Sequence, residues 1–226
     1  ASDFYWVGGS GSWSDPSHWA LSSGGTGGIG FPGSSDNVIF DDNSFDELYP
    51  IIQIPSDVTV QRFELTSNAY PTFLSSSSSI TIKNELRLLN KVGFVLGGAI
   101  VFDADGGVGH EIHTNGTDFG ADIIFKAGNW QLKHHLKTKR DRTIEFKGGY
   151  LKTNNFTIHS RDIVANTGSV TLELGYSHLL AVDLLDLSAA SSSGDGTVAI
   201  AVADGTTSIV DKGDWGDAIM KDVVVA

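Results

Sequence analysis

The stretch Ile123–Gly128 (IIFKAG) returns further along the chain as Ile144–Gly149 (IEFKGG). Gly107 precedes Gly128 by the same interval that separates Gly128 from Gly149. Apolar residues that alternate with a period of two are typical of a half-buried strand, and the glycine that follows permits a sharp turn. Similarity at a fixed period of about 20 residues predicts a solenoid, in which each coil buries its apolar face against its neighbours.

Short alternating runs of the same kind occur from Val58–Val60 to Val170–Leu174, and helical periodicity is scarce. The best helical candidate, Ser177–Ala190, fits a buried strand nearly as well. We therefore predict an all-β protein with a right-handed parallel β-solenoid (β-helix) fold. A β-sandwich with regular hairpins is the alternative. The scarcity of Asn-Gly and Asp-Gly hairpin signals between the middle strands favours the solenoid.

The N-terminal segment differs from the rest, since residues 1–57 include eight acidic side chains and no lysine or arginine. Rigid aromatic side chains among glycines can cover the open end of a β-structure. The predicted structural cap consists of four aromatic residues: Trp6, Trp13, Trp19 and Phe40. We divide the chain into this cap with the first rung, the repeating solenoid rungs, and a C-terminal rung or pairing tail: residues 1–57, 58–190 and 191–226.

Composition excludes several classes of function. The formal net charge of −12 argues against nucleic acid and anionic membranes as partners. The chain has no cysteine, which excludes disulfides and thiolate metal sites. It contains no run of eighteen apolar residues, so the sequence predicts no membrane span. A Gly-x-Ser-x-Gly nucleophile elbow is absent too, and we predict that the protein is not an enzyme.

The middle of the chain is basic. Residues 126–152 hold eight of the fifteen lysines and arginines and only two acidic residues, so this segment carries a local charge of +6. Such a girdle between acidic ends could bind an anionic glycan or the acidic end of another copy. The alternative is that these side chains protect strand edges against aggregation. The candidate ligand-binding residues are Lys133, Lys137, Lys139, Arg140 and Arg142.

Two groups of residues have side chains of the kinds that bind metal ions. Carboxylates clustered in turns offer the oxygen ligands that calcium prefers, although they lack the full spacing of a calcium-binding loop. These candidates are Asp41, Asp42, Asp103 and Asp105. The odd spacing of His110 and His113 places them on opposite faces of a strand, so we interpret them as separate surface residues.

The opening of the chain resembles a known group of proteins. The pattern W-x-G-G-x-G-x-W-S-D-P-x-H-W spans Trp6–Trp19, and P-x-x-x-D-N-V-I-F-D spans Pro32–Asp41. Both are similar to the openings of secreted surface proteins of Bacteroidetes-type bacteria, and the first to those of autotransporter and filamentous-haemagglutinin-like passengers. The resemblance implies β-helical repeats, a secreted or cell-surface location and an adhesive or fibre-forming role. It carries no catalytic motif.

We therefore predict a structural or adhesive module of a bacterial surface protein, whose partners are surface glycans or further copies of itself in a homo-oligomer or fibre. Two alternatives are a polysaccharide-binding module and a polysaccharide lyase or hydrolase built on a β-helix. Arg140-Asp141-Arg142 is the cluster that points to the second of these. No cofactor is expected beyond the calcium considered above.

Overall fold

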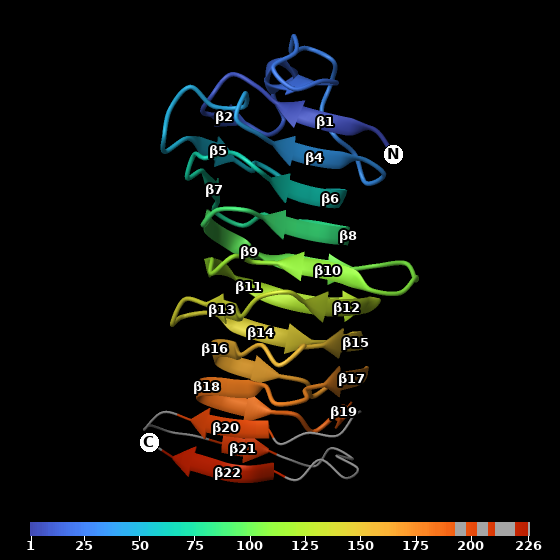
Figure 1. Cartoon of the computed structure of the whole chain (residues 1–226), viewed down its shortest axis with the longest axis vertical. Helices are drawn as coiled ribbons and strands as arrows, with labels where there is room; N and C mark the ends of the chain where they lie inside the picture. Colours follow the sequence, from blue (N-terminus) through green and yellow to red (C-terminus); the bar gives the residue numbers. More distant parts are fainter. Residues whose placement is uncertain (193–197, 203–207, 211–219, 226) are drawn as a thin grey trace.

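The computed structural model describes residues 1–192, 198–202, 208–210 and 220–225. The chain forms a parallel β-solenoid of about seven turns, stacked along the longest axis of the molecule (Figure 1). Along the chain the strands occupy three faces in a repeating order, which we call face A, face B and face C. This arrangement confirms the predicted solenoid and excludes the sandwich.

Each face is a column of parallel strands from successive turns, and several long strands bend from one face onto the next. Face A holds β1 (Asp3–Trp6), β4 (Asn37–Phe40), the second halves of β6 (Val58–Leu65) and β8 (Ile80–Leu88), β10 (His110–His113), β12 (Asn129–Leu132), β15 (Gly148–Lys152), β17 (Ser169–Glu173) and β19 (Ala190–Ser192).

Face B follows face A along the chain. It holds β2 (Gly11–Ser12), β5 (Ile51–Gln53), β7 (Thr72–Ser75), the first parts of β9 (Gly93–Asp103), β11 (Asp118–Ala127), β16 (Ile158–Val164) and β18 (His178–Asp186), and β13 (Leu136–Thr138), β20 (Val198–Val202) and β22 (Met220–Val225). Face C holds the first halves of β6 and β8, the last parts of β9, β11, β16 and β18, and β14 (Thr143–Phe146) and β21 (Ser208–Val210).

The recurrence seen in the sequence is the step between two rungs of face C. Ile123 pairs with Ile144 and Phe125 with Phe146 in the parallel register of β11 and β14. The rings of Phe125 and Phe146 stack with centroids 4.9 Å apart, inside a core that runs through the stack. The repeated glycines lie at the corner that follows: Gly128 has a φ of +97° and Gly149 of +84°, a backbone conformation that favours glycine.

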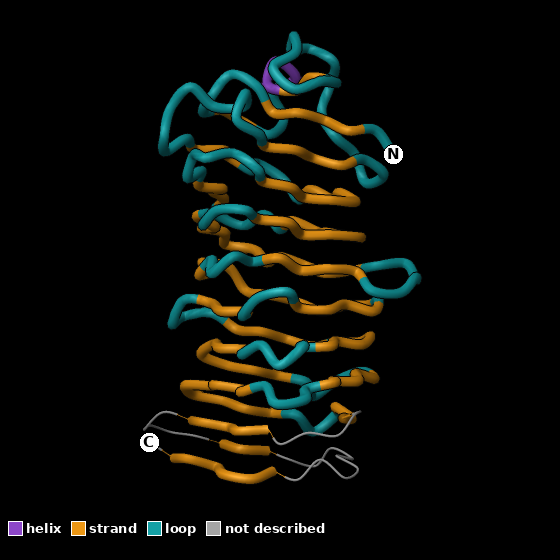
Figure 2. The backbone as a smooth tube through the Cα atoms, in the orientation of Figure 1, coloured by secondary structure: helices purple, strands orange, loops and turns teal. Residues whose placement is uncertain are grey.

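The N-terminal end is closed by an antiparallel hairpin, whose connecting segment contains β2 and the 3₁₀ helix η1 (Pro16–His18) (Figure 2). The hairpin pairs β1 with β3 (Trp19–Ala20), whereas β1 and β4 are parallel, so the solenoid starts within the predicted cap segment. The four predicted cap aromatics, Trp6, Trp13, Trp19 and Phe40, are all buried here. Asp15 caps η1, and hydrogen bonds from the Ser17 hydroxyl and backbone N–H lower the pKa of its carboxyl.

The C-terminal part continues the stack. The helical interpretation of Ser177–Ala190 is wrong, because most of this stretch is strand β18, paired in parallel with β16. Its leucines alternate between core and surface, and they satisfy the strand pattern at least as well as a helical one. Within 191–226, β20 pairs with β18 and β22 pairs with β20. The described part of the chain contains no helix with the length and apolar character that a membrane crossing requires.

Candidate functional sites

The basic middle segment is largely neutralised by its neighbours. Six of its eight cations lie in ion pairs: Lys126–Asp103, Lys133–Glu111, Lys137–Asp118, Arg142–Asp141, Lys147–Glu145 and Lys152–Glu173. Four of these six pairs join different rungs. Within the described residues, Lys139 and Arg140 have no such partner. The girdle predicted from the sequence is thus an alternating surface with a local excess of positive charge at the turn after β13.

That excess faces a hollow of about 630 Å³ on face B, which we call the face-B trough. It is lined by Asp118, Lys137, Thr138, Lys139, Arg140, His159, Ser160, Arg161 and Val182. A second hollow, of about 400 Å³, shares Asp118, Lys137 and His159 with it and adds Lys91 and His135. The two hollows together extend the trough over several rungs. Asp118 is the single carboxylate among the lining residues of both.

The parallel register explains how the trough assembles. Lys137 on β13 pairs with His159 on β16, so these two side chains lie one above the other on adjacent rungs. The pKa of His159 is lowered below its ordinary value of 6.5, first because the ring is partly buried and then because Lys137 and Arg140 lie near it, while Asp118 acts in the opposite direction. Arg161 also lines the trough, although it pairs with Asp162 at 2.7 Å and Asp183 at 3.8 Å.

The structure therefore brings together three of the five predicted ligand-binding residues: Lys137, Lys139 and Arg140. Lys133 lies on face A against Glu111, and Arg142 faces Asp141 at 3.6 Å. Sequence reasoning missed His159 and Arg161. The signal was available, since a step of about one rung from Lys137 and Lys139 leads to these two residues.

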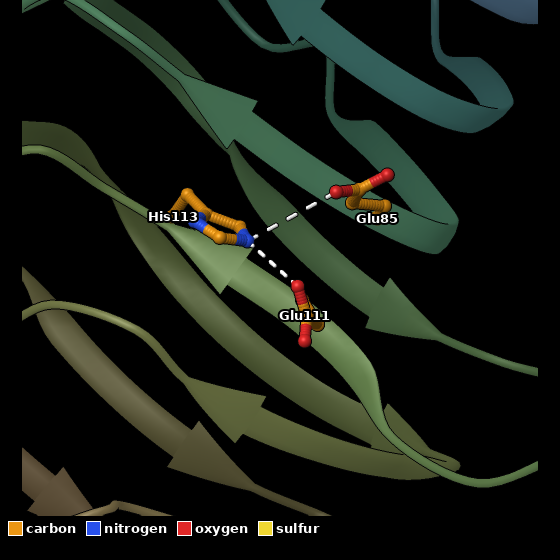
Figure 3. Close-up of side chains that lie close together, drawn as sticks. All are labelled: Glu85, Glu111 and His113. Carbon is orange, nitrogen blue, oxygen red and sulfur yellow. Dashed lines mark hydrogen bonds and ion pairs between the residues drawn. The ribbon is translucent and has the colours of Figure 1, made fainter.

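A second cluster lies on the outer surface of face A, where Glu85, Glu111 and His113 meet (Figure 3). Glu85 on β8 and Glu111 on β10 are register partners on adjacent rungs, and His113 is the next residue after Glu111 on the same face of β10. Nε2 of His113 lies 2.8 Å from Oε2 of Glu111 and 4.0 Å from Oε1 of Glu85. One ligand atom from each residue lies within 4.8 Å of the others.

Two neighbours shape this cluster. Lys133 lies 2.9 Å from Oε1 of Glu111, and its hydrogen bond, followed by that of His113, lowers the pKa of the Glu111 carboxyl. His134 contacts His113 edge to face, with ring centroids 5.9 Å apart. Burial, followed by the charges of His113 and His135, lowers the pKa of His134. Nδ1 of His134 is buried and has no hydrogen-bond partner among the described residues.

The sequence predicts that His110 and His113 lie apart and share no ligand, and their contacts agree with this. The ring of His110 contacts Asn84 and the carbonyl oxygen of Gly106, whereas His113 contacts Glu111. The sequence interpretation overlooked that Glu111 and His113, at alternate positions of one strand, share a face.

The four aspartates considered for calcium have protein partners instead. Asp41 accepts from the backbone N–H of Asn43 and Asp42 from that of Asn68. Asp103 pairs with Lys126 at 2.9 Å, and Asp105 pairs with Lys83 at 2.6 Å. Calcium at these residues stays a prediction, and it would have to displace these contacts.

Comparison of the chain with protein-family models, with curated proteins and with solved structures gave no significant match. The class that the geometry defines is the parallel β-solenoid, a scaffold that supports both binding and catalysis.

Proposed function

We propose that this chain is an adhesive module of a secreted or cell-surface protein, and that it binds an acidic polysaccharide in the face-B trough. The proposal rests on one hollow, in which three cations of one rung meet two side chains of the next rung. The three cations are Lys137, Lys139 and Arg140, and the two side chains are those of His159 and Arg161. The solenoid supplies a stiff support, because each rung is hydrogen-bonded to its neighbours along three faces.

The net charge of −12 does not oppose local binding. Exposed charges separated by more than about 8 Å are largely screened at physiological salt, so a bound polyanion interacts mainly with the trough. The ion pairs there are weak competitors, since exposed pairs contribute about 0–1 kcal/mol each. Asp118 can therefore give up Lys137 to a ligand carboxylate or sulfate at small cost.

The spacing of the polar side chains in the trough suits a glycan. Parallel strands in a sheet lie about 4.8 Å apart, so Lys137 and the register partner His159 present their side chains at an interval comparable with one sugar residue of an extended polysaccharide. Binding also fits the trough better than hydrolysis. Glycosidases use a pair of carboxyl groups, and Asp118 is the single carboxylate among the residues that line the two hollows.

The proposal is tested by titrating the protein with a sulfated polysaccharide, a neutral polysaccharide and single-stranded DNA at physiological salt. We expect the sulfated polymer to bind most tightly. The double variant Lys139→Glu/Arg140→Glu should lose most of this affinity, whereas Lys126→Glu/Lys147→Glu, with the same change in net charge outside the trough, should retain it. Equal losses in both variants, or tighter binding of the neutral polymer or of DNA, would overturn the proposal.

Self-association into a fibre stays a separate prediction. Analytical ultracentrifugation over a range of salt concentrations tests it, and a monomer under every condition would count against the fibre.

A further inference from the structure

We propose that Glu85, Glu111 and His113 form a binding site for a divalent transition-metal ion, and that zinc is the preferred ion. The bound ion would link two adjacent rungs of face A. This site lies on a different face from the trough and is independent of the proposed function.

The geometry needs only small side-chain movements. Zinc binds carboxylate oxygen and imidazole nitrogen at about 2.0–2.2 Å, so two ligand atoms of a tetrahedral site are about 3.4 Å apart. In the cluster, one atom from each of the three side chains already lies within 4.8 Å of the others. The backbone fixes this proximity, because Glu85 and Glu111 are register partners. Rotation about side-chain bonds can close the remaining distance.

Glu85 and Glu111 bring two carboxylates together at this point of the ladder, and Arg87 is the register partner of His113. On the outer surface of face A, Arg62 is the register partner of Glu85, and Gln131 is that of Glu111. The step from Glu85 to Glu111 is therefore the one where two carboxylates face each other, and like charges directly opposite are destabilising. Lys133 contacts Oε1 of Glu111, which leaves Oε2 on the side of His113. A metal ion at Oε2 would not need to displace the lysine.

The donor set selects the kind of ion. Calcium and magnesium prefer oxygen ligands throughout, whereas an imidazole with carboxylates suits zinc and its transition-metal neighbours. Three side chains supply ligand atoms that lie close together, so water is the expected fourth ligand of a tetrahedral ion. The ring of His134 lies against that of His113 and limits the movement of this ligand.

The position of the site in the chain gives the ion a role. The coil of the solenoid that leads from Glu85 to Glu111 contains more residues than the next coil, which leads from Glu111 to its register partner Gln131. The longer coil includes the loop between β9 and β10, which projects from the solenoid (Figure 1) and contains the exposed Val108. A metal ion that bridges β8 and β10 would hold the two rungs together across this extended connection.

The test uses the whole chain without a polyhistidine tag, titrated with zinc and separately with calcium by calorimetry, with thermal unfolding followed in parallel. We expect one equivalent of zinc to bind, no calcium to bind at the cluster, and zinc to raise the melting temperature. The variants Glu85→Gln, Glu111→Gln and His113→Gln should each lose about tenfold or more in zinc affinity, because even the partners of metal ligands contribute about 10–100-fold. They should also lose the thermal shift.

His110→Gln is the matched control, since this histidine lies on the same strand outside the cluster, and it should bind zinc as the wild type does. Cobalt substitution provides a readout of geometry, because tetrahedral cobalt(II) gives intense visible absorption bands, which His113→Gln should remove. Failure of the wild type to bind zinc, or binding by His113→Gln with unchanged affinity, would overturn the proposal. Charge changes in the trough should leave zinc affinity unaltered.

Discussion

Trp13 packs edge-on against Trp19, with ring centroids 4.9 Å apart, and the backbone carbonyl of Trp13 accepts a hydrogen bond of 2.7 Å from the indole nitrogen of Trp19. Trp13 also stacks on Phe63 of β6, the strand that pairs with β4. The cap is thus joined to the solenoid core by continuous aromatic contacts rather than placed over its end.

Replacing Trp13 should therefore destabilise the whole N-terminal end. Trp13→Ala removes a side chain that is 1% exposed, and truncation of a buried tryptophan costs about 3–5 kcal/mol of unfolding free energy. Urea denaturation followed by circular dichroism measures this loss. Tyr176→Ala serves as control, because Tyr176 is 71% exposed and should change stability little. Near-wild-type stability of Trp13→Ala would show that the cap does not close the core.

The fold was predictable where rungs have equal length. The pairing of Ile123 with Ile144 can be seen in the sequence because register partners here are a constant number of residues apart. This number is the same between β11 and β14 as between β12 and β15. The step from Arg62 to Glu85 is longer, and the step from Glu85 to Glu111 is longer again, so no fixed period runs through the N-terminal rungs. Loops at the corners absorb these differences without disturbing the ladders.

The sites were less predictable for the same reason. Lys137, Lys139 and Arg140 are visible as a run of charge, but His159 joins them only through the register of β13 and β16. Glu85 meets Glu111 across an extended step, which no local motif encodes. A sequence pattern shows which residues share one face of a strand. Which residues become neighbours on different rungs depends on the length of every corner between them, and the pattern does not show those lengths.

The repeated glycine should be sensitive to a single methyl group. At Gly149, φ is +84°, and a Cβ atom would collide with the carbonyl oxygen of Gly128 on the neighbouring rung. Gly149→Ala should therefore lose more than the roughly 1–2 kcal/mol that a left-handed backbone alone costs. Gly28→Ala separates the two causes, because Gly28 has a φ of +107° but no atom near its Cβ position. Equal losses of unfolding free energy in urea would contradict the predicted clash.

His159 should make stability depend on pH in a defined direction. Its pKa in the folded protein is lowered below 6.5, chiefly by burial. The unfolded chain therefore takes up this proton at a higher pH than the folded chain does. The contribution of His159 to the free energy of unfolding is present above pH 6.5 and decreases as the pH falls from there through the lowered pKa.

Urea denaturation at neutral and mildly acidic pH tests this direction. The wild type should lose more stability on acidification than His159→Gln, whereas His178→Gln, which removes an exposed histidine from β18, should follow the wild type. A steeper loss in His159→Gln than in the wild type would reverse the predicted sign.

Occupation of the trough should raise the same pKa. His159 lines the trough together with Lys137, Arg140 and Arg161, and Asp118 is the single carboxylate of the lining. An anionic ligand would offset this positive charge and favour the protonated imidazole. Binding of a sulfated polysaccharide, whose own charge is constant, should therefore take up a proton and grow tighter as the pH falls through the range in which histidine titrates. Calorimetry in buffers of different ionisation enthalpy measures the proton uptake. His159→Gln should bind with a flatter pH profile, and an unchanged profile in this variant would exclude His159 from the binding site.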